Sequence, residues 1–127
     1  MGLDMYLFES EKENATFDDW EDLKELIYWR KANAIHRWFV INVQDYKDDC
    51  EIYPVSKEKL EELLYTCKEV LNDYTKAKEL LPTQEGFFFG STLYDDDYFD
   101  DIIFTMNNLI KILNRKDLEN LYYCSSW

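Results

Sequence analysis

The sequence contains few residues that interrupt regular structure. Its 127 residues include only three glycines and two prolines. Because glycine supplies the backbone conformations of tight turns and proline breaks helices and strands, this scarcity predicts long regular elements with few tight turns. Gly86 and Gly90 enclose a phenylalanine run, but no Gly-Lys-Ser or Gly-Lys-Thr ending follows it. A P-loop is therefore excluded, and a buried strand or tight loop is expected over this segment.

Histidine and cysteine are also scarce. His36 is the only histidine, and one histidine does not build a zinc site unless thiolates or carboxylates converge on it. The cysteines are Cys50, Cys67 and Cys124, an odd number whose spacing fits no disulfide or metal framework. We therefore expect free thiols of a cytosolic protein, with no metal ion and no cofactor.

Long hydrophobic runs are missing. No apolar run reaches the roughly 18 residues that a membrane-spanning helix needs. The first residues lack the basic region and apolar core of a signal peptide. Met1-Gly2 begins like a myristoylation motif, but Tyr6 stands where that motif requires serine or threonine. We expect a cytoplasmic protein that has no membrane partner.

Positive charge is scarce as well. The chain has 14 Lys plus Arg against 27 Asp plus Glu, which gives a net charge of −13. A chain this acidic repels the phosphate backbone, so no direct binding to nucleic acid is expected. Hydrophobic residues make up 46% and aromatic residues 17% of the sequence. This content predicts a folded chain rather than a disordered one, and the length fits a single domain over residues 1–127.

The carboxylates are concentrated in three blocks, at residues 18–22, 45–51 and 95–101, whose only cation is Lys47. If folding gathers the blocks on one face, they imitate the charge of a nucleic-acid backbone and compete for a basic groove. Otherwise they form a solvated surface. The candidate partner-binding residues are Asp18, Asp19, Asp22, Asp45, Asp48, Asp49, Asp95, Asp96, Asp97, Asp100 and Asp101, with the adjacent Tyr94 and Tyr98.

The aspartate run that begins at Asp95 does not form a calcium loop. An EF-hand needs glycine at its sixth position and glutamate at its twelfth, and these positions hold Asp100 and Met106. Carboxylates in the first turn of a helix interact favourably with its dipole. The run therefore predicts a helix start, and no metal site is expected.

One basic spot stands out in this acidic chain. Arg30 and Lys31 follow Trp29 at the start of a predicted helix, where cations could bind a phosphate or carboxylate ligand. They could equally neutralise nearby acidic blocks. His36 lies on the apolar stripe of that helix, which favours a packed, hydrogen-bonded histidine over a catalytic base. No cysteine signature of a known protease family accompanies it, and no catalytic motif is decisive.

Hydrophobic periodicity predicts an α+β fold, a small and mostly antiparallel sheet packed by about three amphipathic helices. Ser56 is a good N-cap for the second helix, and Pro82 ends that region, with a break near Asp73. The expected strands are residues 3–8, a strand ending near residue 30, residues 51–55 and residues 121–127. The expected helices are residues 31–43, a helix after residue 56 and a helix from about residue 95.

Four stretches resemble a family of small, uncharacterised proteins of bacterial phages and prophages. They are residues 1–7 (MGLDMYL), 28–40 (YWRKANAIHRWFV), 80–92 (LLPTQEGFFFGST) and 123–127 (YCSSW). The resemblance implies a phage context, in which small acidic proteins often inhibit host defence, including CRISPR nucleases and restriction enzymes. It supplies no catalytic residues.

Two functions follow as hypotheses. The first is an acidic phage accessory protein that binds and inhibits a basic, nucleic-acid-handling defence protein, such as a nuclease, through charge competition or nucleic-acid mimicry. The second is a nucleotide-binding protein or small hydrolase whose pocket mixes polar and aromatic groups. The candidate pocket residues for the second function are Trp29, Arg30, Lys31, His36 and Gln84. The oligomeric state and the identity of the partner stay open, and oligomerisation through an exposed apolar face is a third, plainer alternative.

Overall fold

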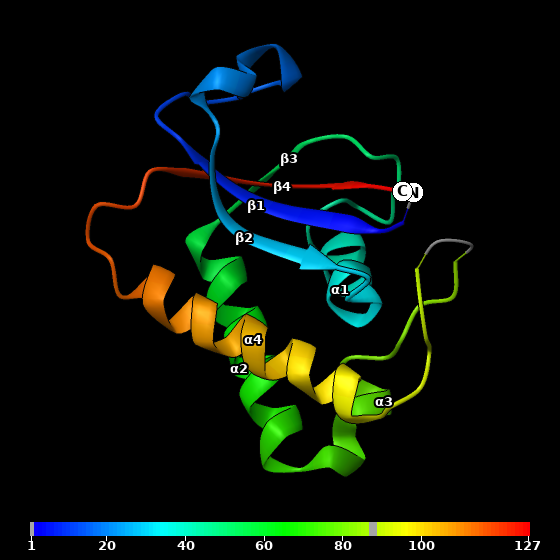
Figure 1. Ribbon diagram of the computed structural model, residues 1–127. Helices are drawn as coiled ribbons and strands as arrows, with labels where there is room; N and C mark the ends of the chain where they lie inside the picture. Colours follow the sequence, from blue (N-terminus) through cyan, green and yellow to red (C-terminus); the bar gives the residue numbers. More distant parts are fainter. Residues whose placement is uncertain (1, 87–88) are drawn as a thin grey trace.

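The computed structural model describes residues 2–86 and 89–127, and within them four strands form one antiparallel sheet (Figure 1). The strand order is β2-β1-β4-β3, so the first and last strands of the described chain are the central neighbours. The strands are β1 (Asp4–Ser10), β2 (Lys24–Arg30), β3 (Tyr53–Val55) and β4 (Asn120–Ser126). The predicted α+β class with an antiparallel sheet is confirmed.

Three helices cover one face of this sheet, and a short helical segment lies on its other side (Figure 1). The covering helices are α1 (Asn33–Asn42), α2 (Lys57–Asn72) and α4 (Asp96–Leu113). The segment on the other side is η1 (Phe17–Asp22). The short helices η2 (Tyr74–Lys76) and α3 (Ala77–Leu80) follow α2.

The alternation of side chains along the strands creates two apolar layers. Met5 and Leu7 of β1 point into the main core. There they lie with Trp29 of β2, Phe39 of α1 and Leu63 of α2. Other strand residues form a smaller cluster on the opposite face, with Phe8, Tyr122 and Cys124 buried in it. Period-two alternation thus places aromatic side chains on both faces of the sheet.

The helix starts follow from local capping. The Ser56 hydroxyl accepts a hydrogen bond from the Lys59 N–H at 3.1 Å, as predicted for α2. The Asp95 carboxylate accepts one from the Tyr98 N–H at 3.2 Å, so Asp95 caps α4 and confirms the predicted helix start. In contrast, Ala32 precedes α1 and offers no side-chain cap.

Some predicted boundaries are shifted. The helix expected from residue 31 begins at Asn33, because Lys31 has a left-handed φ of 55° and donates its N–H to the Leu3 carbonyl at 2.7 Å. The expected break near Asp73 is present between α2 and η2. The buried strand or tight loop expected over residues 86–90 falls partly outside the described residues. Gly86, Phe89 and Gly90 are described, and they belong to no strand.

Candidate functional site

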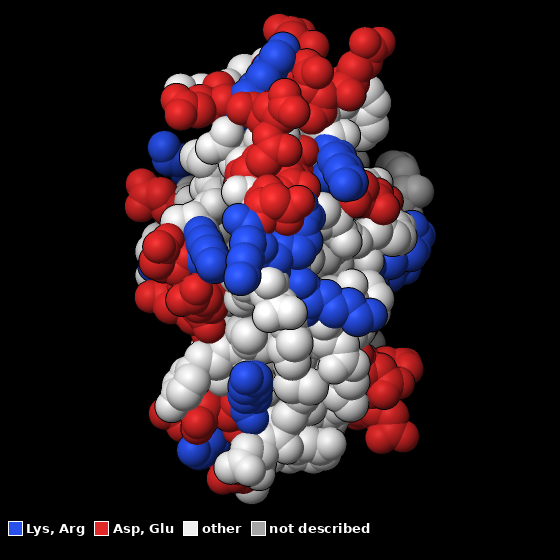
Figure 2. Space-filling model, turned by 90° about the vertical axis from the view of Figure 1, so that its left-hand side faces the viewer, with Lys and Arg blue, Asp and Glu red and all other residues white. Residues whose placement is uncertain are grey.

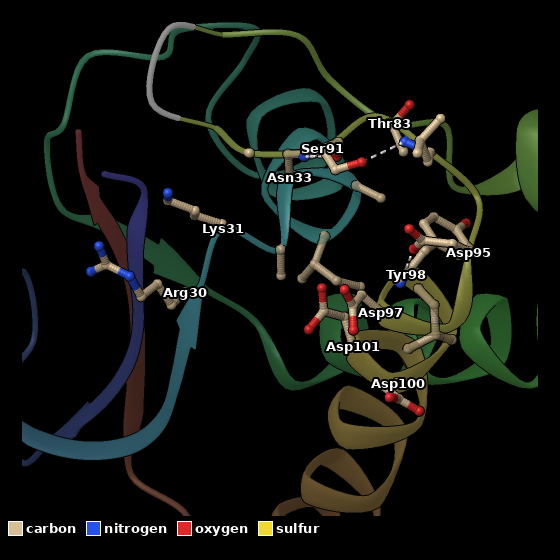
Figure 3. A pocket seen from close by; sticks show the side chains of 16 residues that line it. Arg30, Lys31, Asn33, Thr83, Ser91, Asp95, Asp97, Tyr98, Asp100 and Asp101 are labelled. Carbon is tan, nitrogen blue, oxygen red and sulfur yellow. Dashed lines mark hydrogen bonds between the residues drawn. The ribbon is translucent and has the colours of Figure 1, made fainter. Parts of the chain in front are cut away.

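A cavity of about 360 Å³ opens between the start of α1, the first turns of α4 and four residues of the connection between α3 and α4, namely Thr83, Gly90, Ser91 and Leu93 (Figure 3). We call it the α1–α4 cleft. Arg30 and Lys31 line one side of it, and Asp97 and Asp101 line another. The cleft therefore combines the basic spot predicted at the start of α1 with the third acidic block, two features that lie more than 60 residues apart in the sequence.

Asn33 holds the cleft in shape. Its side-chain amide donates hydrogen bonds to the carbonyls of Phe89 and Ser91, both at 2.9 Å. Its side-chain oxygen accepts one from the Gln84 N–H at 3.0 Å. Because all three partners belong to the segment after α3, one buried side chain at the start of α1 fixes that segment against the helix. Sequence reasoning missed Asn33, since nothing in the local pattern distinguishes it from an exposed asparagine.

The acidic wall of the cleft is electrostatically unfavourable by itself. Burial, and to a smaller extent the negative charges of Asp97, Asp100 and Asp95, together raise the pKa of Asp101 to about 6. Within residues 2–86 and 89–127, no Lys or Arg side chain forms an ion pair with these four carboxylates. A cation that entered the cleft would relieve this repulsion.

The basic wall is partly neutralised. Arg30 Nη1 lies 3.0 Å from the Asp4 carboxylate on the neighbouring strand β1. The Lys31 side chain packs beside Gly90, where a Cβ atom would come within 3.2 Å of it. Gly90 has a φ of +82°, which also favours glycine. Arg30 thus links the cleft to the edge of the sheet, and Lys31 is the cation more open to a ligand.

His36 lies at the centre of a buried hydrogen-bonded chain. Its Nδ1 is 2.6 Å from the Tyr123 hydroxyl, and its Nε2 is 2.9 Å from the Asp48 carboxylate. The Trp127 indole N–H donates to the same carboxylate at 3.0 Å. Burial tends to raise the pKa of Asp48, but the hydrogen bonds from His36 and Trp127 outweigh it and lower that pKa.

This chain has the order of a hydroxyl, imidazole and carboxylate relay, but the Tyr123 hydroxyl, which would be its nucleophile, is closed off from solvent. His36 and Tyr123 are both 0% exposed. Burial also holds the pKa of Tyr123 well above its ordinary value. A nucleophile must be accessible and activated, and Tyr123 is neither. The geometry fits the packed, hydrogen-bonded histidine that the sequence favoured.

The candidate ligand residues of the second hypothesis do not share one cavity. Arg30 and Lys31 line the α1–α4 cleft. His36 and Gln84 line a separate cavity of about 240 Å³. Trp29 is in the core at 2% exposure, and its indole N–H donates to the Thr105 hydroxyl at 2.8 Å. The candidate set is therefore divided among two cavities and the core.

The three acidic blocks also occupy different places. The first lies on η1, on the opposite side of the sheet from the start of α4, which carries the third (Figure 1). Lys12 pairs with Asp19 and Asp22 at 2.8 and 2.9 Å. Figure 2 shows carboxylates at the η1 end of one face with a band of Lys and Arg below them. The first and third blocks therefore do not share one face of the sheet (Figure 1).

Three of the remaining candidate partner residues, Asp49, Tyr94 and Tyr98, form hydrogen bonds within the protein. Asp49 accepts a hydrogen bond from the Tyr53 hydroxyl at 2.7 Å. Tyr98 is buried and donates its hydroxyl to the Leu81 carbonyl at 2.7 Å. The Tyr94 hydroxyl accepts from the Thr83 N–H at 3.1 Å. Asp45 has a left-handed φ of 53° in the turn after α1. Asp18 and Asp96 are exposed in the first turns of η1 and α4.

No group of His, Cys, Asp or Glu side chains in the described part of the chain could hold a metal ion. Among the same residues, none of the helices has the length and apolar character to cross a membrane.

Comparisons with protein-family models, with curated proteins and with solved structures found no match. The function is therefore argued from the geometry of the molecule.

Proposed function

We propose that this protein is a non-enzymatic accessory protein, encoded by a phage or prophage, that binds and inhibits a basic, nucleic-acid-handling protein of host defence. The α1–α4 cleft receives a cationic side chain of that partner. The net charge of −13 steers the approach of a basic surface, since the attraction extends over about 10 Å at 0.1 M salt.

The acidic wall of the cleft is the observation that carries this proposal. Asp101 is held in a half-buried position among Asp95, Asp97 and Asp100, and its pKa is about 6. A half-buried carboxylate that lies among like charges without a cation destabilises a folded protein, and such arrangements are concentrated at functional sites. A lysine or arginine of the partner would provide the missing counter-charge.

The arrangement favours local charge competition over mimicry of an extended duplex. Mimicry needs a regular row of charges, about one per 1.7 Å of duplex axis. The blocks on η1 and α4 lie on opposite sides of the sheet, so they do not present such a row together (Figure 1). The cleft can still occlude one basic contact of the partner, which is sufficient for steric and electrostatic inhibition.

Purified nucleases of the RNA-guided and restriction classes provide the test. The wild-type protein is expected to inhibit DNA cleavage by at least one of them. The double variant Asp97→Asn/Asp101→Asn should weaken inhibition by about tenfold, because it removes the negative charges that pair with a cation of the partner. A tenfold loss of affinity corresponds to about 1.4 kcal/mol of binding free energy. The matched control is Glu58→Gln/Glu61→Gln, which removes the same charge from exposed positions of α2.

If both double variants lose inhibition equally, only the net charge matters, and the cleft is not the site that binds the partner's cation. Failure to inhibit any nuclease of either class would reject the proposed function itself. Circular dichroism of each variant shows whether the fold is retained.

A second candidate function, binding of a small anionic ligand, is favoured by one observation. The α1 helix begins at the cleft without a side-chain cap, next to Arg30 and Lys31. Free N–H groups at a helix start attract phosphate, and a cavity of about 360 Å³ is large enough for a small ligand. Binding of inorganic phosphate that is lost in Lys31→Ala and kept in Asp97→Asn/Asp101→Asn would favour this candidate.

A further inference from the structure

A row of aromatic rings crosses the sheet face that α1, α2 and α4 leave uncovered. Tyr28 of β2 lies beside Tyr6 of β1, with ring centroids 5.3 Å apart. Tyr6 stacks on Phe8 at 5.5 Å, and Phe8 meets Trp20 of η1 edge-on at 5.7 Å. We call these four residues the aromatic row. Its members come from three elements, so the row exists only in the folded protein.

The two ends of the aromatic row are open to solvent. Trp20 is 59% exposed and Tyr28 is 39% exposed, whereas Phe8 between them is buried at 3%. Exposed aromatic rings that are anchored on buried ones keep a fixed position, so little side-chain entropy is lost when they bind a partner. Exposed rings gathered in this way are typical of an interaction surface.

Carboxylates frame the aromatic row. Asp4 accepts a hydrogen bond from the Tyr28 hydroxyl at 2.5 Å, but Arg30 already pairs with it at 3.0 Å. Among the described residues, Glu25 and the η1 carboxylates Asp18 and Glu21 are unpaired, so they are the ones that a partner cation would meet. Glu25 is paired with Phe8 in the β1–β2 register and is exposed. After burial, the charges of Asp4 and Glu25 contribute to the raised pKa of Tyr6, which places both carboxylates near its ring. The block on η1 adds exposed carboxylates on either side of Trp20.

Rings framed by carboxylates fit one kind of partner best. Guanidinium groups stack on aromatic faces and form paired hydrogen bonds with carboxylates, which lysine does less well. Phosphate groups are repelled by the same carboxylates, so a single-stranded nucleic acid is a poor fit. In the described sheet, β2 is an outer strand with β1 as its only neighbour, which leaves room for an extended segment along its free edge.

We infer that the aromatic row is a docking surface for an extended, arginine-rich segment of the partner protein. This inference rests on the proposed function, since it assigns a second contact to the same basic partner. Phe8 and Tyr6 belong to the smaller cluster, on the face of the sheet opposite the main core, so the row and the α4 carboxylates of the cleft lie on opposite sides of the sheet. A partner that binds both the aromatic row and the α1–α4 cleft would contact the sheet from both of its faces.

A fluorescently labelled peptide of alternating arginine and serine tests the inference by fluorescence anisotropy. The wild-type protein is expected to bind it more tightly than matched lysine–serine and glutamate–serine peptides or oligothymidine. Trp20→Ala and Tyr28→Ala should each weaken binding about fivefold, and Glu25→Gln about threefold. Tyr65→Ala is the matched control, because Tyr65 is 66% exposed on α2, outside the row, and should leave binding unchanged.

Three results would overturn the inference: unchanged binding in all row variants, tighter binding of oligothymidine, or a concentration-dependent dimer in sedimentation that the row variants abolish. If Tyr28→Ala fails to fold, Trp20→Ala and Glu25→Gln decide the outcome. If the cleft variant Asp97→Asn/Asp101→Asn weakens nuclease inhibition and the aromatic-row variants leave it unchanged, this inference is rejected and the proposed function stands. If the arginine–serine peptide binds at the aromatic row but the protein inhibits no nuclease, the proposed function is rejected and the docking surface stands.

Discussion

Asp101 is a residue whose charge opposes folding. Its folded pKa of about 6 exceeds the ordinary value of 3.8, because burial and then the neighbouring aspartates disfavour the anion. The stability that its neutral form contributes is therefore present below about pH 4 and is lost as the pH rises through 6. For a fully buried carboxyl group, a pKa shift of this size corresponds to about 3 kcal/mol of unfolding free energy. Because Asp101 is partly exposed, we expect a contribution of roughly 1 kcal/mol. Asp101→Asn should raise the free energy of unfolding by about that amount at neutral pH.

Urea denaturation at acidic and neutral pH checks this. The variant should lose the decline in stability between about pH 4 and 6 that the wild type shows. Glu61→Gln on α2 is the control, since that exposed side chain has no such surroundings. An identical pH profile for wild type and Asp101→Asn would contradict the account of the acidic wall.

At the scale of elements, His36 joins α1 to β4 and to the turn that follows α1. His36→Ala removes the ring and leaves the Tyr123 hydroxyl without its partner at a fully buried position. Loss of a buried ring and an unpaired hydroxyl together predict a destabilisation of about 3 kcal/mol, measured by urea denaturation. Arg37→Ala, on the next position of the same helix, should change stability by less than about 1 kcal/mol. A stable His36→Ala that no longer inhibits a nuclease would instead indicate a functional histidine.

The elements were predictable where the signal is local. Hydrophobic periodicity and the Ser56 and Asp95 caps specified α2 and α4 within a few residues. The cleft was not predictable, because it brings together residues near 30, residues 83 and 90–93, and residues 95–102, and one sequence carries no information on which distant segments meet. The aromatic row was hidden for the same reason. Only the β1–β2 register places Tyr28 beside Tyr6.

At the scale of the whole molecule, the net charge of −13 predicts opposite effects of salt on folding and on binding. Raising NaCl from about 50 to 500 mM shortens the screening distance from about 14 to 4 Å, which weakens self-repulsion in the folded state. The melting temperature should therefore rise by a few degrees, while inhibition of the partner nuclease should weaken at least tenfold.

Differential scanning calorimetry and the cleavage assay measure the two effects on the same samples. Glu58→Gln/Glu61→Gln carries two fewer negative charges and should show a smaller rise in melting temperature. Inhibition that does not change with salt would remove the electrostatic part of the proposed function.

The position of β4 has a consequence for how the protein folds. β4 pairs with β1 along its length, from Asp4 opposite Ser126 to Ser10 opposite Asn120, so the centre of the sheet joins segments more than 100 residues apart. Contacts so distant along the chain slow folding, since a large loop must close before they stabilise anything. During synthesis, β1 and β2 can form only a lone hairpin, which is marginal in water. The sheet therefore completes in one late step, when β4 leaves the ribosome and inserts between β1 and β3.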